Sequence, residues 1–424
     1  MSLSVHIRKK LKTGTLDVSF ESEDGILAIL GETGSGKTAA LRCIAGLDRP
    51  DEGSIVLDGK PLFDSLHGVN LAAKRRGIGY LSAEGGLHPR RTVEQNLRRA
   101  LSLAAKREGR SAWDSGEGRR KRLRAGQRKL AVTQRIPQIL AEYELDGFGG
   151  SYPRELSRTQ YLMASLACVM AGKPRLLLLD EPFADLDPFE RAKMLRKLRD
   201  KIVQPAAPVG PGSAAKGSMY GAVVAGRKPG GNVTIPGTAG GEEAFAQLPH
   251  QAVFASSDAE EVYAMSSHVM VMSQGVSQPA REKEDFFTSP VTVSAALLSG
   301  CSNVTKASAL DAFHAFAPEW GSVFLFREEG EFHPVPPRLQ CVGIREHSFR
   351  RLVPEGETEG DYFRFTVHIV RIEDTLTEWR VWFRTGSSAK GELLWQIPKS
   401  EISREEIHAV KRLFVADKDI MRLI

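Results

Sequence analysis

Residues 26–42 read Ile-Leu-Ala-Ile-Leu-Gly-Glu-Thr-Gly-Ser-Gly-Lys-Thr-Ala-Ala-Leu-Arg, and this stretch decides the fold of the first half of the chain. The apolar run at residues 26–30 predicts a buried parallel strand, and a helix is expected to begin at Thr38. The glycines between them allow the backbone to curl so that successive N–H groups converge on one anion. The helix N-terminus adds partial positive charge. A strand, a glycine-rich loop and a helix in this order predict a phosphate-binding loop.

The predicted phosphate loop supplies both a cation and a metal-binding hydroxyl. Lys37 can reach the β- and γ-phosphates of a nucleoside triphosphate, and the Thr38 hydroxyl can ligate Mg²⁺. A glycine-rich loop without a nucleotide is the alternative, but every fixed position of the motif is filled. The loop residues are Gly31, Glu32, Thr33, Gly34, Ser35, Gly36, Lys37 and Thr38.

A second apolar run, at residues 176–179, predicts a core strand that ends in the acidic pair Asp180-Glu181. At the end of a strand, Asp180 can hold Mg²⁺ directly or through water. Glu181 can orient and deprotonate an attacking water molecule, which makes it the candidate general base. Such a pair can also be a helix cap. The phosphate loop upstream favours the catalytic interpretation.

The composition is that of a soluble globular protein with room for two domains: 424 residues, 42% hydrophobic and 26% charged. No run approaches the ~18–20 apolar residues of a membrane span, and the first residues lack the apolar core of a signal peptide. The net charge of +6 is compatible with nucleotide, an anionic membrane face or nucleic acid, and does not choose between them. The cysteines have no metal-ligand spacing and are expected to be reduced and mostly buried: Cys43, Cys168, Cys301 and Cys341.

Composition and pattern predict an α/β domain at residues 1–290 and a β-rich domain at residues 291–424. Within the first domain, residues 92–165 are expected to form a helical subdomain. Residues 204–250 are a Gly- and Pro-rich insertion that is not expected to form regular structure. In the second domain, alternation with period two predicts short strands. Their expected inward positions are Phe363, Phe365, Val367, Ile369, Trp379, Val381 and Phe383.

The order of the motifs resembles that of the ATPase subunit of ABC transporters. The phosphate loop is followed by Leu-Ser-Arg-Thr-Gln at residues 156–160, Leu-Leu-Leu-Leu-Asp-Glu-Pro at 176–182 and Ala-Asp-Leu-Asp at 184–187. Residues 59–81 and 86–97 are most similar to the molybdate/tungstate and sulfate importer branch. The resemblance covers residues 3–205 and 251–290, and it implies a P-loop ABC-type α/β ATPase domain followed by a small β-rich domain.

The resemblance also implies a head-to-tail dimer with two ATP molecules between the subunits. Each ATP would lie between the phosphate loop of one subunit and the signature segment, residues 156–160, of the other. Ser157 and Gln160 would then serve the partner's γ-phosphate, and Asp187 would help couple the two sites. Ser157 is also a good helix N-cap. The two interpretations are compatible, because a helix N-terminus aimed at phosphate is the binding mechanism.

Three parts of the site depart from the family pattern. Arg158 and Thr159 replace two signature glycines, which alters close backbone approach to phosphate. Ala83 stands where the family has a glutamine, and Glu84 is one residue too late to substitute. Ser257 stands where the family has a switch histidine, and serine cannot carry a positive charge. One lost transition-state contact typically costs ~10²–10³ in rate, so hydrolysis can be slow while ATP binding survives.

The expected function is that of the ATP-binding subunit of an importer, which couples ATP binding and hydrolysis to transport of an oxyanion such as molybdate or tungstate. ATP and Mg²⁺ are the expected cofactors. Membrane-embedded permease subunits and a second ATPase subunit, identical or different, are the expected partners, with no nucleic acid. The chain would lie in the cytoplasm, peripheral on the inner face of the membrane. The alternative is a hydrolysis-poor regulatory switch in a transporter complex, which Ala83 and Ser257 favour.

Two basic features are open to more than one interpretation. The run at residues 119–124 is either a solvated charged face or a site of attraction to anionic lipid headgroups. Nucleic-acid binding is a third interpretation, which is disfavoured because no aromatic residues alternate with the charges apart from Trp113 nearby. In the β-rich domain, which weakly resembles the importer branch's accessory domain, Arg345 and His347 are either exposed strand residues or donors to an oxyanion. The sequence leaves both questions open.

Overall fold

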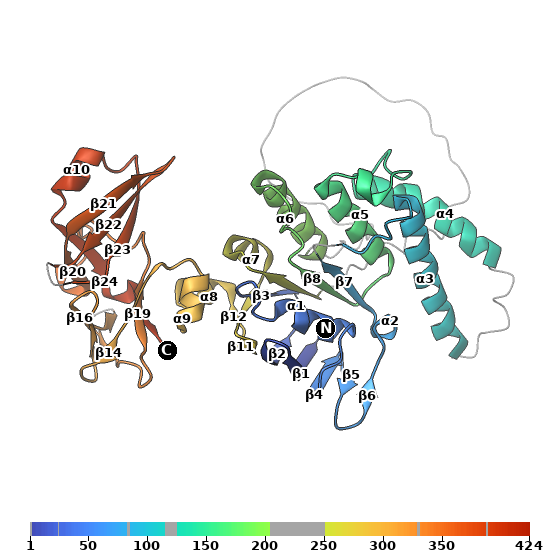
Figure 1. Ribbon diagram of the computed structural model, residues 1–424, viewed down its shortest axis with the longest axis horizontal. Coiled ribbons are helices and arrows are strands. Elements are labelled where there is room, and N and C mark those ends of the chain that lie inside the picture. The colour runs from blue at the N-terminus through green and yellow to red at the C-terminus, as the bar shows by residue number, and fades with distance from the viewer. Residues whose placement is uncertain are drawn as a thin grey trace, which may run out of the picture. The chain divides into compact units, whose positions relative to one another are not determined.

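The computed structural model describes residues 2–23, 25–82, 85–114, 125–203, 251–328, 331–386 and 389–424. These residues fall into two compact units (Figure 1). We call the described residues between 77 and 252 the helical unit, and residues 2–76 with 253–424 the sheet unit. The predicted domain boundary at residue 290 stays a prediction.

The sheet unit is built around a mixed sheet with the strand order β6-β5-β4-β1-β2-β11-β10-β3-β9. Strand β10 runs parallel to β3, and β1 is antiparallel to both β2 and β4. From Ile26 to Leu30, β3 is buried at every position, as expected of a parallel strand covered on both faces. The strands are β1 (Leu3–Leu11), β2 (Gly14–Ser22), β3 (Gly25–Leu30), β4 (Glu52–Leu57), β5 (Lys60–Asp64), β6 (Val69–Asn70), β9 (Gln251–Ser256), β10 (His268–Ser273), β11 (Val276–Ser277) and β12 (Arg281–Glu282), which pairs with β10.

Short helices connect these strands, and the first of them follows the phosphate loop. Its C-terminal carbonyl groups, at Cys43 and Ile44, accept hydrogen bonds of 2.8 Å from the Arg76 guanidinium. Arg76 is the last residue of a helix, and the next strand begins at Ile78. The helices are α1 (Lys37–Ala45), α2 (Ala73–Arg76), α7 (Ala259–Met265), α8 (Lys283–Thr288) and α9 (Val293–Leu298).

The helical unit pairs two parallel strands, β7 (Ile78–Ser82) and β8 (Leu176–Asp180), beside longer helices. Helix α3 packs against both α4 and α5. The predicted helical character after residue 92 is confirmed where the structure describes the chain. Ala83, Glu84, the basic run 119–124 and the insertion 204–250 lie outside the described residues. The helices are α3 (Val93–Asp114), α4 (Ala125–Glu142), α5 (Arg158–Ala171) and α6 (Pro188–Val203), with a 3₁₀ turn, η3, at Pro153–Glu155.

The C-terminal part of the sheet unit is β-rich, as predicted, and consists of several small antiparallel sheets. These sheets are β13-β19-β25, β14-β15-β16, β17-β18, β20-β24 and β21-β22-β23. The elements are β13 (Asn303–Lys306), β14 (Ser308–Ala309), β15 (His314–Ala317), β16 (Ser322–Leu325), β17 (Arg327–Glu328), β18 (Glu331–Phe332), β19 (Cys341–Ile344), η4 (Glu359–Asp361), β20 (Tyr362–Thr366), β21 (His368–Asp374), β22 (Glu378–Arg384), β23 (Leu393–Pro398), α10 (Arg404–Ala409), β24 (Arg412–Ala416), η5 (Asp417–Asp419) and β25 (Ile420–Leu423).

An aromatic core holds these small sheets together. Phe365 and Phe383 are buried, and both rings pack against Phe349 in edge-on geometry. The predicted inward faces are confirmed, although the stretch expected as one strand is broken between β20 and β21 at Val367. On the outward face, the Arg371 guanidinium lies 3.8 Å from the centre of the Trp382 ring.

Arg345 connects the β-rich part to the helices that precede it. Its guanidinium donates to the Ser299 carbonyl and hydroxyl oxygens, both at 3.1 Å, and to the Phe287 carbonyl oxygen. These bonds account for Arg345 without an anion. His347 is exposed, and its role as an anion donor stays a prediction.

Asp417 makes the stability of the β-rich part depend on pH. Its side chain is 9% exposed, and burial raises its pKa from 3.8 to about 6, against the attraction of Arg327. The folded-state pKa lies above the unfolded value, so the folded state binds more protons at pH values between the two. The free energy of unfolding therefore falls as the pH rises through this window. We expect Asp417→Asn to raise the free energy of unfolding at pH 7 by about 1–3 kcal/mol and to flatten this part of the profile.

Denaturant unfolding between about pH 3 and pH 7, roughly two units either side of the midpoint of the two pKa values, measures this effect. Asp311→Asn is the control, because hydrogen bonds from Phe313 and His314 lower the pKa of that exposed carboxyl. We expect no gain in stability at neutral pH from this control. A pH profile that Asp417→Asn leaves unchanged would contradict the assignment.

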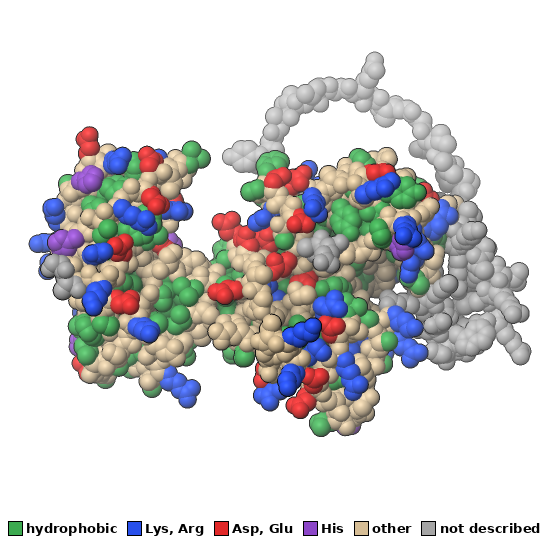
Figure 2. Space-filling model, viewed as in Figure 1, with side chains coloured by type: hydrophobic (Ala, Val, Ile, Leu, Met, Phe, Trp, Pro, Cys, Tyr) green, Lys and Arg blue, Asp and Glu red, His purple; other side chains and the backbone are tan. Residues whose placement is uncertain are grey.

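The surface is mixed in charge. On the face shown in Figure 2, acidic and basic side chains are interspersed with apolar ones. Among the helices that the structure describes, none combines the length and the apolar character that a membrane span needs.

Candidate nucleotide-binding site

The phosphate loop joins the end of β3 to the start of α1, which confirms the predicted strand, loop and helix. Gly34 and Gly36 have φ values of 86° and 105°, in the left-handed region that favours glycine. A Cβ at Gly31 would lie 2.3 Å from the Met272 carbonyl oxygen, whereas one at Gly34 would meet nothing within 4 Å. Glycine is therefore needed for close packing at Gly31 and for backbone curvature at Gly34 and Gly36.

Lys37 and Ser35 give the loop its polar interior. The Lys37 ammonium, on a side chain that is 3% exposed, donates to the carbonyl oxygens of Gly31 at 2.7 Å and Glu32 at 3.0 Å. The Ser35 hydroxyl is buried and has no hydrogen-bond partner among the described residues. A buried hydroxyl without a partner is costly, so this group fits a ligand that supplies an acceptor, such as a phosphate oxygen.

Residues far along the chain support the loop. The Gly275 N–H donates to the Ser35 carbonyl oxygen at 3.0 Å, and the Gly31 N–H donates to that of Ser256 at 3.3 Å. Gly275 lies in the β10–β11 turn, where both it and Gln274 have positive φ. This support is not predictable from the sequence, because no local pattern shows which distant turn packs against the loop.

The end of β9 therefore lies beside the phosphate loop. Ser257 is exposed directly after this strand, at the position of the expected switch histidine. Asp258 caps α7, and its Oδ1 accepts hydrogen bonds from the N–H groups of Glu260 and Glu261. The serine hydroxyl adds no positive charge near the loop.

In the helical unit, the acidic pair follows β8. Asp180 is 4% exposed, and its Oδ2 accepts a hydrogen bond of 2.7 Å from the Tyr80 hydroxyl on β7. Glu181 has a φ of 46°, which a non-glycine residue adopts at an energetic cost. Such backbone strain is concentrated at functional sites, where it directs a side chain. Tyr80 is a residue of this cluster that the sequence pattern did not single out.

The signature segment begins α5. Ser157 is the N-cap, and it exchanges two hydrogen bonds with Gln160: the Ser157 hydroxyl accepts from the Gln160 N–H at 3.2 Å, and the Gln160 amide oxygen accepts from the Ser157 N–H at 2.9 Å. The cap interpretation of Ser157 is confirmed. Contact of either residue with a partner's phosphate stays a prediction.

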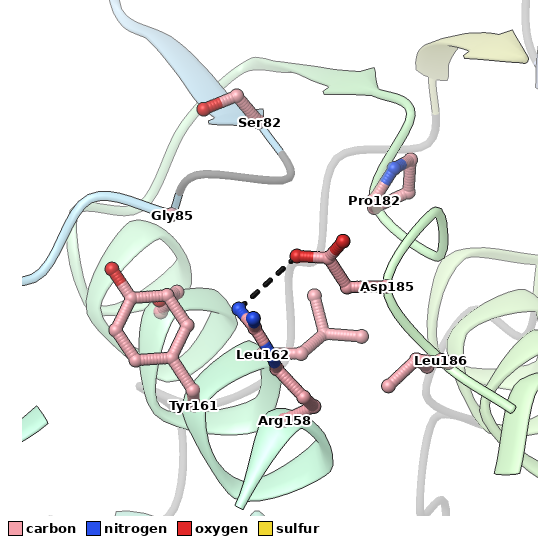
Figure 3. A pocket seen from close by; sticks show the side chains of 9 residues that line it. Ser82, Gly85, Arg158, Tyr161, Leu162, Pro182, Asp185 and Leu186 are labelled. Atoms are coloured by element: carbon pink, nitrogen blue, oxygen red, sulfur yellow. Dashed lines mark ion pairs between the residues drawn. The ribbon is translucent and has the colours of Figure 1, made fainter. Parts of the chain in front are cut away.

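The two residues at glycine positions connect the start of α5 to the segment before α6 and to the first turn of α6. The Arg158 guanidinium forms an ion pair with the Asp185 carboxylate at 3.1 Å (Figure 3). The Thr159 hydroxyl donates to the Glu190 carboxylate. Asp187 caps α6, with its Oδ1 accepting from the Glu190 N–H at 2.9 Å. Arg158 and Asp185 help to line a small pocket, together with Ser82, Gly85, Tyr161, Leu162, Ser165, Pro182 and Leu186.

Comparison with known proteins agrees with these features. Residues 16–184 match the family model described as ABC transporter. These residues form an ABC transporter domain. The match contains the phosphate loop, the signature segment and the acidic pair. It supports the fold class predicted from the motif order: an ABC-type α/β ATPase domain followed by a β-rich region.

The relatives of this ABC domain include ATP-binding proteins for import of different ions. The chain is 32% identical over 204 residues to the molybdenum import protein ModC of Rhizobium johnstonii, covering 47% of this chain and 51% of that protein. It is 34% identical to the sulfate/thiosulfate import protein CysA of Synechocystis, over 45% of this chain and 47% of that protein. It is 36% identical to the Fe(3+) import protein FbpC of Pseudomonas fluorescens, over 42% of this chain and 43% of that protein. The chain spans about half the length of the curated relatives it matches.

Proposed function

We propose that this chain is the ATP-binding and ATP-hydrolysing subunit of an ABC importer. The phosphate loop carries the proposal, because it combines left-handed glycines, a Lys37 side chain folded back onto the loop, and a buried Ser35 hydroxyl with no hydrogen-bond partner among the residues that the structure describes. The ABC domain and the import proteins among its relatives support the same function.

The residues present suit ATP with Mg²⁺. The loop N–H groups and Lys37 would hold the phosphates, and Thr38 with Asp180 would hold the metal. Mg²⁺, when bound, would neutralise charge on the phosphate oxygens. Glu181 would accept a proton from a water molecule. The oxygen of that water would attack the γ-phosphorus while the bond between the γ-phosphorus and the ADP oxygen breaks. The strained backbone at Glu181 is consistent with a side chain directed to this task.

The partners in this proposal are membrane permease subunits and a second ATPase subunit, identical or different. Ser157 and Gln160 would face the γ-phosphate bound by the partner, with the chain on the cytoplasmic side of the membrane. The proposed cargo is an oxyanion, molybdate or tungstate, which the molybdenum and sulfate import relatives support. The iron import relative makes a metal cation the alternative cargo.

A second candidate function is a regulatory switch that binds ATP and hydrolyses it poorly. Ser257 favours it, since a serine at the end of β9 supplies no positive charge beside the phosphate loop. Ala83 favours it from the sequence, because alanine neither ligates Mg²⁺ nor orients water.

Binding of ATP to the purified protein tests the phosphate loop. We expect Lys37→Ala to weaken ATP binding by roughly 10²-fold, since a charge-assisted contact with phosphate is lost. Lys60→Ala is the matched control, because Lys60 is exposed on β5 and far from the loop in sequence; its affinity is expected to equal that of the wild type. Circular dichroism checks that the loss of the Lys37 hydrogen bonds leaves the fold intact. Equal affinity in both variants would overturn the assignment of the loop.

ATP turnover with and without the permease separates the two functions. If the permease stimulates ATP hydrolysis, the result supports the function of an importer subunit. ATP binding with negligible turnover in the assembled complex supports the regulatory switch.

A further inference from the structure

Tyr80 and Asp180 meet where the paired strands β7 and β8 end and the acidic pair begins. The two strands are parallel, with Tyr80 beside Leu178 and Ser82 beside Asp180. Tyr80 and Ser82 are two residues apart, so their side chains lie on the same face of β7. The Tyr80 hydroxyl reaches toward the end of β8 and donates to Asp180 Oδ2 at 2.7 Å. Phenylalanine at this position would keep the ring and lose the donor.

The hydrogen bond from Tyr80 falls on a carboxylate that is almost completely buried. Asp180 is 4% exposed, and the four leucines before it on β8 are fully buried, so its carboxylate needs polar partners in place of water. A hydrogen bond to a carboxylate is stronger than one between neutral groups. A bond to one carboxylate oxygen also restricts rotation of the group, which fixes the direction of the other oxygen. The Tyr80 hydroxyl therefore sets the orientation of the Asp180 carboxylate.

The backbone that carries Tyr80 is held by close packing. A Cβ at Gly79 would lie 2.6 Å from Cγ1 of Val169, so β7 approaches α5 too closely for a larger residue there. The Arg175 N–H, just before β8, donates to the Gly77 carbonyl oxygen, just before β7, at 2.8 Å. The position of the Tyr80 hydroxyl is thus set before any metal ion arrives.

We infer that Tyr80 is a positioning residue for the metal site, whose hydroxyl orients the Asp180 carboxylate to bind Mg²⁺ together with the nucleotide. Mg²⁺ requires nearly ideal octahedral geometry and is usually bound by only one or two carboxylates, so the orientation of each carboxylate matters. Ala83, which follows β7, has no side-chain oxygen to add. The inference rests on the proposed function, because that function places ATP and Mg²⁺ beside Asp180.

Binding of Mn²⁺, a paramagnetic substitute for Mg²⁺, tests the inference without turnover. The full-length chain is mixed with a smaller amount of a non-hydrolysable ATP analogue, and free Mn²⁺ is measured by electron paramagnetic resonance. Tyr80→Phe is expected to weaken Mn²⁺ binding by roughly tenfold, as for other lost hydrogen bonds to metal ligands. Tyr152→Phe is the matched control, because it removes the hydroxyl of a tyrosine in the same unit that is 38% exposed. This control is expected to bind Mn²⁺ like the wild type.

Further measurements separate positioning from a purely structural role. Asp180→Ala is expected to weaken Mn²⁺ binding, and adding Tyr80→Phe to it is expected to cause no further loss, because the hydroxyl acts through the carboxylate. In ATP hydrolysis, Tyr80→Phe is expected to raise the Mg²⁺ concentration at half-maximal rate by roughly tenfold. The rate at saturating Mg²⁺ is expected to stay close to that of the wild type. Circular dichroism checks that each variant is folded.

Three outcomes would overturn the inference. Equal Mn²⁺ affinity in Tyr80→Phe and the wild type gives Tyr80 a structural role only. An equal loss in Tyr80→Phe and Tyr152→Phe means that the effect does not come from the bond to Asp180. A further loss of the same size when Tyr80→Phe is added to Asp180→Ala means that the hydroxyl acts independently of the carboxylate.

Binding of the ATP analogue without metal, in the presence of a chelator, separates these failures from a failure of the proposed function. We expect the wild type, Tyr80→Phe and Tyr152→Phe to bind the analogue equally. If the wild type does not bind it, the proposed function fails and the inference fails with it. If the analogue binds and Mn²⁺ affinity does not depend on Tyr80, only the inference fails.

Discussion

Glu181→Gln is expected to lower the rate of ATP hydrolysis by roughly 10²–10⁴-fold while leaving ATP affinity nearly unchanged. Glutamine keeps the size and position of the side chain but cannot accept a proton from the attacking water. The backbone at Glu181 is strained, with a φ of 46°, so the folded chain already bears a cost to direct this side chain. Phosphate release at steady state and ATP binding at equilibrium, measured on the same preparation, separate the two effects.

Asp146→Asn is the matched control for this experiment. Asp146 is an exposed carboxylate in the same unit, so its replacement makes the same change in charge away from β8. We expect the control to hydrolyse ATP at the wild-type rate. If Glu181→Gln also hydrolyses at that rate, another group is the general base and the assignment of Glu181 is wrong.

Ser257→His is expected to raise the rate of ATP hydrolysis by roughly tenfold or more, short of the ~10²–10³ that one transition-state contact can supply. Ser257 is exposed and follows β9, whose last carbonyl group accepts a hydrogen bond from Gly31 of the phosphate loop. An imidazole there adds a donor that can carry charge near the γ-phosphate. The gain is smaller than the full contact, because Ala83 still lacks the glutamine side chain and groups in one site act together.

Two further variants make the histidine result interpretable. Ser257→Ala is expected to keep the wild-type rate, since the serine hydroxyl is not expected to contribute to hydrolysis. Ser257→His combined with Lys37→Ala is expected to show no gain, because the histidine acts only on bound ATP. An unchanged rate in Ser257→His alone would mean that the missing charge does not limit turnover, and the regulatory switch would gain support.

The local elements of the site were predictable because each depends on residues close together in sequence. A run of apolar residues followed by glycines and Lys37 predicted the strand, the loop and the helix, and all three are confirmed. Ser157 was expected to be a helix N-cap, and its hydroxyl accepts a hydrogen bond from the first turn of α5. In each case the interacting groups lie within four residues of one another, so the sequence contains the whole interaction.

Contacts across long stretches of chain were not predictable. Nothing near Asp180 in the sequence identifies Tyr80 as its hydrogen-bond donor, 100 residues earlier. Nothing near Arg76 in the sequence shows that its guanidinium is buried against the carbonyl groups at the end of α1. Arg345 had the chemistry of an anion donor, and its hydrogen bonds to Ser299 and Phe287 became visible only in the fold.

The sequence by itself determined the chemistry of this protein: a phosphate-binding loop, an acidic pair after a core strand, and an ABC-type order of motifs. These follow from residue type and short-range spacing, which local sterics and hydrogen bonding translate directly into structure. Only the tertiary structure showed that the loop is supported by the β10–β11 turn and that Arg158 pairs with Asp185. Those features depend on which distant surfaces pack together, and packing is decided by the burial of the whole chain and not by any one segment.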